Sequence, residues 1–140
     1  MKADIEITFS NGIRENGSVR FRPGEAIQGR VTITPRADIP CEHVYLRLLW
    51  RTKGRGDRYL CKIAEEDIFQ GTLGKGVPLV REFTFALPKE PWSYNGKFLS
   101  IIWGVEVQVD AIRARDIQTQ APFLMRPDGA LAASLLEDTK

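Results

Sequence analysis

LVREFTFALPKEPWSYNGKFLSIIWGVEVQV, residues 79 to 109, is the stretch of sequence that decides the fold. It contains two segments in which apolar residues occupy every second position, joined by a proline-bounded loop. The alternating positions are Phe83, Phe85 and Leu87 in the first segment and Ile101, Trp103, Val105, Val107 and Val109 in the second. Successive side chains of a β-strand point to opposite faces of a sheet, so this period predicts two strands that each bury one face.

The same pattern extends over most of the chain. Further strands are predicted over residues 3–9, 18–21, 25–34, 43–52, 58–69 and 114–124. Turn dipeptides such as Asn11-Gly12 and Pro23-Gly24 separate them. Seven or eight strands without a helix indicate an all-β, two-layer antiparallel β-sandwich of immunoglobulin-like type over residues 1–126. Residues 127–140 are expected to form a short helix or a tail.

The alternation also predicts which side chains form the core. Trp50, Trp103, Phe83 and Phe85 are expected to supply much of it, at about 1.5–3 kcal/mol for each buried side chain. On the strand that follows residue 57, the inward set is predicted to be Tyr59, Cys61 and Ile63. Gly29 stands among inward positions, which suggests a bulge or the close approach of another backbone.

Size and charge limit the class of protein. The chain has 140 residues, 43% hydrophobic and 27% charged, as expected for one globular domain. Twenty Lys and Arg against eighteen Asp and Glu give a net charge of +2, which by itself argues neither for nor against a polyanionic partner. No nucleic acid partner is predicted. No apolar run approaches the roughly 20 residues of a membrane span, and the N-terminus lacks the apolar core of a secretory signal. We therefore expect a cytoplasmic protein without a membrane span.

The two cysteines are predicted to be free. In a hairpin of residues 43–52 and 58–67, Cys61 lies opposite Leu49 and Trp50, and Cys41 lies about 30 Å further along the partner strand. A disulfide requires Cα atoms within about 7 Å. Free thiols agree with a reducing compartment.

Three separate segments resemble arrestin-like domains. Residues 21–31, FRPGEAIQGRV, resemble the P-G-E-x-I-x-G-x-V opening of these domains, and residues 44–52, VYLRLLWRT, resemble the strand that follows. FTFALP, SYNGK and IIWGV, within residues 83–105, are similar to the family's F-x-F-x-L-P, S-Y-x-G-x and I-x-W-x-V run. The resemblance covers about residues 18–110 and implies an arrestin-like topology.

The chain also departs from the family. Arrestins and α-arrestins contain two such domains, and 140 residues have room for one. The proline-tyrosine motifs that recruit ubiquitin ligases are missing, so receptor regulation and ubiquitin-ligase adaptation are not carried over. The resemblance implies a single domain similar to bacterial arrestin-like proteins, in a group of scaffold, adaptor and sorting proteins.

Motifs that would indicate chemistry are weak. Arg55-Gly56-Asp57 would bind integrins only in a secreted protein, and residues 71–76 lack the spacing of a phosphate loop. His43 is the only histidine, and no cluster of other ligands accompanies it. We therefore predict no catalytic residue, no metal site, no cofactor and no enzymatic activity.

The best polar candidate for a binding site is basic. Between residues 47 and 62 one acid, Asp57, faces six cations, which are Arg47, Arg51, Lys53, Arg55, Arg58 and Lys62. Arg47, Arg51 and Lys62 are expected on the outward face of the sheet. Together with Arg58 they would hold a phosphorylated segment or an anionic headgroup. The alternative, which we favour, is a solvated face balanced by acids of other strands. Tyr45 and Leu49 lie on the same outward face and form either an apolar contact patch or a surface covered by the C-terminal tail.

These features predict a non-enzymatic protein-interaction module, an adaptor or scaffold, with a protein partner. The rival hypothesis is a ligand-binding sandwich that recognises anionic headgroups, phosphorylated segments or carbohydrate, although only Trp92 is loop-borne. Sheet edges are expected at residues 116–120 and at the N-terminal strand, where a partner segment or a second copy would add a strand. A homodimer is therefore predicted, with Tyr45 and Leu49 as an alternative contact.

Overall fold

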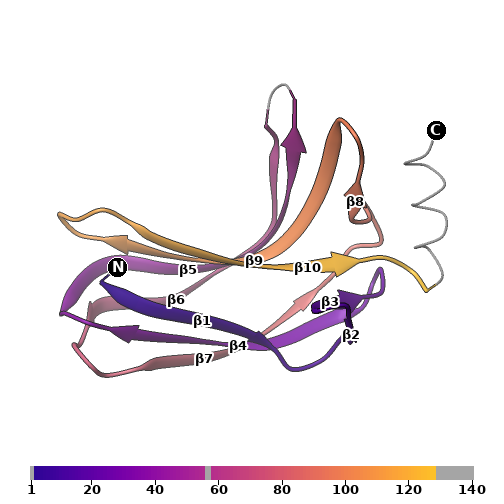
Figure 1. Cartoon of the computed structure of the whole chain (residues 1–140). Helices are drawn as coiled ribbons and strands as arrows, with labels where there is room; N and C mark the ends of the chain where they lie inside the picture. The colour runs from indigo at the N-terminus through magenta and orange to yellow at the C-terminus, as the bar shows by residue number, and fades with distance from the viewer. Residues whose placement is uncertain (1, 56–57, 129–140) are drawn as a thin grey trace.

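The chain folds into two β-sheets packed face to face (Figure 1). The computed structural model describes residues 2–55 and 58–128, and these residues contain strands and no helix. The strands are β1 (Ala3–Phe9), β2 (Ile13–Glu15), β3 (Ser18–Phe21), β4 (Ala26–Pro35), β5 (Ile39–Gly54), β6 (Leu60–Leu73), β7 (Leu79–Ala86), β8 (Tyr94–Asn95), β9 (Leu99–Ala111) and β10 (Ile117–Met125). The described part of the chain thus has no helix of the length and apolarity needed to cross a bilayer.

The small sheet has the order β1-β4-β7, and the large sheet has the order β2-β3-β10-β9-β5-β6 with β8 added on β9. The predicted all-β sandwich is confirmed. Two short strands, β2 and β8, add to the eight that the alternation indicates. One pairing departs from the antiparallel rule, because β10 runs parallel to β3 at Leu124↔Arg20 and Met125↔Phe21. Of the predicted tail or helix at 127–140, residues 129–140 lie outside the described part.

The core lies between the two sheets. Trp103 is fully buried, and Phe83 and Phe85 are buried opposite it on the small sheet, as predicted. Rings of Phe9, Phe21 and Phe123 meet edge to face, with centroids 5.4–5.8 Å apart. At Gly29 a Cβ would lie 2.3 Å from the carbonyl oxygen of Thr8, which confirms the expected close backbone approach.

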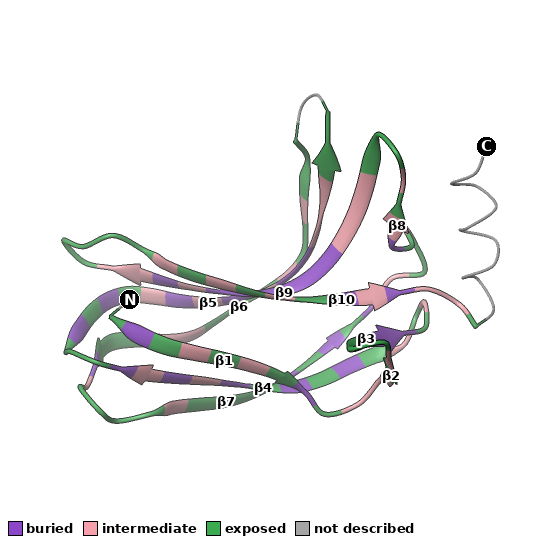
Figure 2. Ribbon diagram, in the orientation of Figure 1, coloured by how far each residue is buried: buried purple, intermediate pink, exposed green. Residues whose placement is uncertain are grey.

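The predicted inward set of β6 is wrong as a core set. Tyr59 is 57% exposed, Ile63 is 38% exposed and Cys61 is half-buried. Ile63 falls in a bulge, since Leu48 pairs with Ala64 and Leu49 pairs with Lys62. The hairpin of β5 and β6 also rises beyond the small sheet, so no second layer covers it (Figure 2). Tyr59 lies instead against Trp50, whose own side chain is half-buried.

The hairpin and its cysteines agree with the sequence prediction. Cys61 pairs with Trp50 and Cys41 with Gly71, and both thiols are free. β1 is an edge of the small sheet, as expected. β10 lies between β9 and β3, yet residues 117–122 pair with β9 alone among the described residues. The segment 116–120 is therefore a local edge, and β6 and β7 are further edges that the alternation did not indicate.

Candidate functional site

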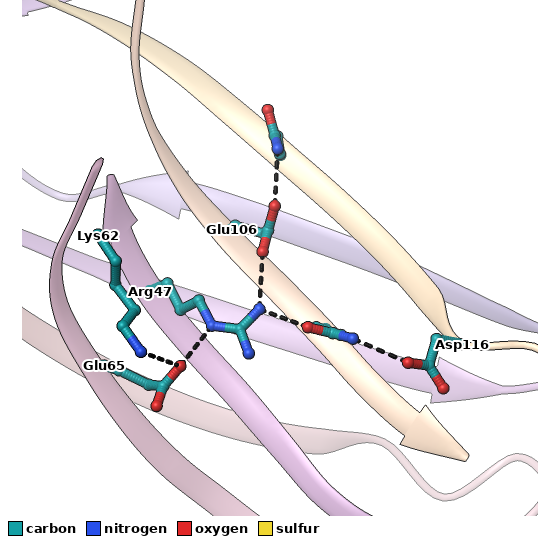
Figure 3. A network of polar contacts seen from close by, with 7 residues as sticks. Arg47, Lys62, Glu65, Glu106 and Asp116 are labelled. Carbon is teal, nitrogen blue, oxygen red and sulfur yellow. Dashed lines mark hydrogen bonds and ion pairs between the residues drawn. The ribbon is translucent and has the colours of Figure 1, made fainter. Parts of the chain in front are cut away.

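The basic face predicted from the sequence is an ion-paired network (Figure 3). Arg47 on β5 bonds Glu65 of β6 at 2.5 Å and Glu106 of β9 at 3.0 Å, and it also contacts Gln108. Lys62 lies 3.2 Å from the same Glu65. These pairs cross three strands because Arg47 stands opposite Glu65 on one side and Glu106 on the other.

The network continues to β10 through amides. Gln120 donates to Glu106 at 2.7 Å, and Gln108 donates to Asp116 at 2.8 Å. Only 7% of the Glu106 side chain is exposed, so its charge depends on these partners. The hydrogen bond from Arg47 is the main cause that lowers the pKa of Glu65. Acids of the neighbouring strands β6 and β9 thus balance Arg47, and Glu65 of its own strand balances Lys62.

The other predicted site residues are distributed differently. Leu49 stands opposite Gly104 and is only 1% exposed, so it does not contribute to an exposed apolar patch. Tyr45 is half-buried, with its ring stacked on His43 and the Arg47 guanidinium 4.8 Å above it. Arg51 and Arg58 form no ion pair with any other described residue. The structure therefore does not gather the six predicted residues into one open patch.

A second site lies where two strands of the large sheet separate. β9 and β10 pair as far as Trp103 and Phe123, after which β9 carries β8 while β10 continues beside β3. The space between them is a groove of about 560 Å³, which we call the β8–β10 groove. It is lined by Ser18, Lys53, Gly54, Ser93–Ile102, Pro122–Leu124 and Arg126.

The loop between β7 and β9 builds one wall of this groove. The Trp103 indole donates to the carbonyl oxygen of Pro91 at 2.8 Å. Ser93 is buried and bonds Met125 twice, through its backbone N–H and through its hydroxyl oxygen. Gly96 lets the loop turn back, because a Cβ there would lie 2.3 Å from the Tyr94 ring. The S-Y-x-G motif is thus the part of the sequence that forms the wall.

The groove combines apolar side chains with positive charge. Ile101, Ile102 and Leu124 are half-buried along it. Lys53, Lys97 and Arg126 supply three cations, and no Asp or Glu is among the described residues that line it. The Nε of Arg126 is buried and has no hydrogen-bond partner among the described residues. Such a groove favours a ligand that carries both apolar and anionic groups.

Sequence reasoning missed the groove residues as a site. Ser93–Lys97 stand out in the sequence, but we interpreted them as a signature of the fold. Arg126 follows the last predicted strand, residues 114–124, in a segment where the sequence shows no alternation. The signal that would have indicated a site is the absence of acids in residues 91–103, where Lys97 is the only charged residue.

The described residues hold no group of three or more metal-ligating side chains. Cys41 is buried, and its burial raises the pKa of its thiol, which disfavours the reactive thiolate. The His43 ring lies 2.6 Å from the Asp67 carboxylate, and Gln70 is the other side chain in this group. None of the hydrogen bonds described for His43 and Asp67 involves a Ser, Thr or Cys side chain.

Neither a protein-family model nor a curated protein matches this chain. Among solved structures, the chain is similar to Spo0M, the sporulation control protein of Bacillus subtilis, with a TM-score of 0.66 and 18% sequence identity. The match covers 90% of this chain and 50% of Spo0M, so the chain spans about half the length of that protein. At this identity the likeness shows the fold alone, and that fold is the arrestin-like β-sandwich.

Proposed function

We propose that the protein is a non-enzymatic interaction module, an adaptor or scaffold, which binds an extended acidic segment of a partner protein in the β8–β10 groove. The observation that carries this proposal is the set of three cations, Lys53, Lys97 and Arg126, in an apolar groove whose described lining contains no acidic residue. Its volume of about 560 Å³ is in the range of protein ligand sites.

The groove suits an extended peptide because it runs between the strands β9 and β10, with the loop that carries β8 as one wall. Apolar side chains of the segment would pack against Ile102 and Leu124, and its carboxylates would meet Lys97 and Arg126. Hydrogen bonds to charged groups contribute about 1.5–3 kcal/mol each. The buried, unpartnered Nε of Arg126 would gain a partner on binding, so the peptide would remove an existing cost.

Two further observations support this role. The solved structure that shares the fold carries the name of a control protein, which agrees with regulation by binding. The free thiols of Cys41 and Cys61 agree with a reducing compartment, and we propose the cytoplasm. The carbohydrate alternative has less support. Trp92 is exposed, but its indole N–H already donates to the backbone carbonyl oxygen of Lys89.

The test is an NMR titration of the ¹⁵N-labelled protein with a short peptide of alternating Glu and Leu. Saturable shifts are expected at Tyr94–Leu99 and Leu124–Arg126, and a peptide with Lys in place of Glu should give none. Lys97→Glu should weaken binding at least about tenfold, which corresponds to the loss of one charged hydrogen bond.

Arg115→Glu is the matched control, because Arg115 is exposed, lies between β9 and β10 and does not line the groove. It changes the net charge as Lys97→Glu does and should leave the affinity unchanged. Equal losses in the two variants would reduce the effect to net charge and contradict the proposal. Shifts that map to the Arg47 network instead would move the site to the outward sheet face.

A further inference from the structure

Two turns meet at one end of the molecule, beyond the small sheet (Figure 1). One is the turn of the β5–β6 hairpin and the other leads into β9. Gly54 pairs with Leu99, and the Arg55 N–H donates to the carbonyl oxygen of Phe98 at 3.3 Å. A Cβ at Gly54 would lie 2.1 Å from that oxygen, so the two turns are in close contact. We call residues 53–55, 58–60 and 97–99 the hairpin tip.

The hairpin tip carries four large apolar side chains that are exposed. Exposed fractions are 61% for Phe98, 57% for Tyr59, 55% for Leu60 and 42% for Leu99. Figure 2 shows in the colour of exposed residues the segments on either side of the β5–β6 turn and the turn before β9. Single exposed apolar residues are ordinary, but a group of four on one projecting end indicates a surface that is covered in function.

Cations stand between these apolar residues. They are Lys53, Arg55, Arg58 and Lys97, and the described residues of the hairpin tip include no acid. None of the four forms an ion pair with another described residue, and the Lys97 ammonium lies 5.5 Å from the Phe98 ring centroid. The occupant of this surface must therefore be both negatively charged and apolar.

We infer that the hairpin tip inserts into the interface of a membrane that contains anionic lipids. Aromatic side chains and the stems of Lys and Arg prefer the level of the lipid headgroups, where an apolar body and a polar end are both accommodated. A projecting end of two turns can enter this layer without unfolding. Each basic residue near an anionic surface strengthens binding by roughly fivefold. Four cations, less the opposing charge of Asp57 between Arg55 and Arg58 in the sequence, therefore add roughly a hundredfold.

This inference goes beyond the proposed function. The hairpin tip shares Lys53, Gly54 and residues 97–99 with the lining of the groove, but the variants that test it change residues outside the groove. Tyr59, Leu60 and Arg58 belong to the hairpin tip and do not line the β8–β10 groove. A membrane-bound tip would hold the groove close to the lipid surface, where a partner segment at the membrane would reach it. Failure of one proposal therefore leaves the other standing.

The test is flotation of the full chain with vesicles of phosphatidylcholine, with and without about one third phosphatidylserine. Binding is expected only to the anionic vesicles, and it should fall steeply between about 0.05 and 0.5 M salt. The double variant Tyr59→Ser with Leu60→Ser should weaken binding at least about tenfold, because two apolar side chains no longer enter the interface. Arg58→Glu should weaken it further and reduce its salt dependence.

The matched control is Val77→Ser with Lys75→Glu, an exposed apolar residue and a cation between β6 and β7. It should bind vesicles like the unchanged protein. Urea unfolding of all variants verifies that they fold, and the groove peptide should still bind to each of them. Three results would overturn the inference: no binding to anionic vesicles, equal binding by the Tyr59→Ser, Leu60→Ser variant, or a protein partner that needs the hairpin tip while vesicles do not bind.

Discussion

At the level of single residues, Arg47 holds charges from two neighbouring strands in one network. Its side chain is 18% exposed and that of Glu106 is 7% exposed. Arg47→Met would leave the Glu106 carboxylate with Gln120 alone, and breaking a buried pair in this way costs about 3–5 kcal/mol. We expect a loss near the lower end of this range, measured by urea unfolding, because Glu65 keeps Lys62.

Arg51→Met is the control for this variant. Arg51 lies on the same strand, is half-buried and has no ion pair with a described residue, so its loss should change stability by no more than about 0.5 kcal/mol. The double variant Arg47→Met with Glu106→Leu should regain most of the stability, since it removes both charges. If Arg47→Met cost no more than Arg51→Met, the network would have no role in stability.

The same network and two other carboxylates make stability depend on pH. The pKa of Glu65 is lowered mainly by Arg47, that of Asp67 mainly by Gln70 and then by His43, and that of Asp128 mainly by Arg22. A carboxyl group whose pKa is lower in the folded chain stabilises folding while it is ionised. This contribution is complete above the unfolded pKa of about 4 and is lost as pH falls through the folded value.

Urea unfolding between about pH 7 and pH 2 should therefore show a plateau above about pH 5 and a decline below about pH 4. Asp67→Asn should make the decline shallower. Glu42→Gln, at an exposed position near the start of β5, is the control and should leave the curve unchanged. A decline that begins near neutral pH would assign the effect to another group.

At the level of elements, Gly54 is the point where the β5–β6 hairpin meets the turn before β9. Its φ is 154°, and the Phe98 carbonyl oxygen occupies the place of a Cβ. Gly76 has a φ of 73° and no atom within 4 Å of a Cβ, so Gly76→Ala has only the backbone cost of about 1–2 kcal/mol. Gly54→Ala adds a steric clash and should cost about 1–3 kcal/mol more.

Urea unfolding of the two variants measures this difference. Gly54→Ala should also weaken vesicle binding, because the two turns of the hairpin tip would no longer remain in contact. Gly76→Ala should bind vesicles normally. Equal stability losses in the two variants would show that the backbone at Phe98 moves away from the new Cβ without loss of stability, which would contradict the prediction.

The elements are also where sequence reasoning works best. Strict alternation in residues 83–87 and 101–109 predicts both strands and the buried face of each. The inward set of β6 fails because a bulge at Ile63 shifts the alternation, and because length along a strand does not tell where the facing sheet ends. Register across strands, such as Arg47 between Glu65 and Glu106, requires the pairing itself.

At the level of the whole molecule, the β8–β10 groove joins segments that are far apart in sequence. Ser18, Lys53, the loop at 93–98 and Arg126 come from four parts of the chain. No one of these segments indicates in its own sequence that it meets the others, and only the separation of β9 from β10 makes them neighbours. Local patterns therefore predict the sandwich, while the candidate site depends on topology.

The homodimer stays a prediction, and the free edges indicate how it would form. β1 pairs with β4 on one side and with no described strand on the other. A second copy that adds its own β1 there would extend the small sheet across the pair. Asp4, Glu6 and Thr8 are exposed on this strand, so Thr8→Glu would place three acids of each copy along the joint.

Sedimentation velocity from low to high micromolar concentration tests this prediction. The unchanged protein should show a reversible shift from monomer to dimer, and Thr8→Glu should shift it at least about tenfold toward monomer, which about 1.4 kcal/mol of repulsion achieves. Thr84→Glu on β7, the opposite edge of the same sheet, is the matched control and should leave the equilibrium unchanged. A strictly monomeric protein at every concentration would rule out the dimer, and the free edge of β1 would then be available only to a different partner.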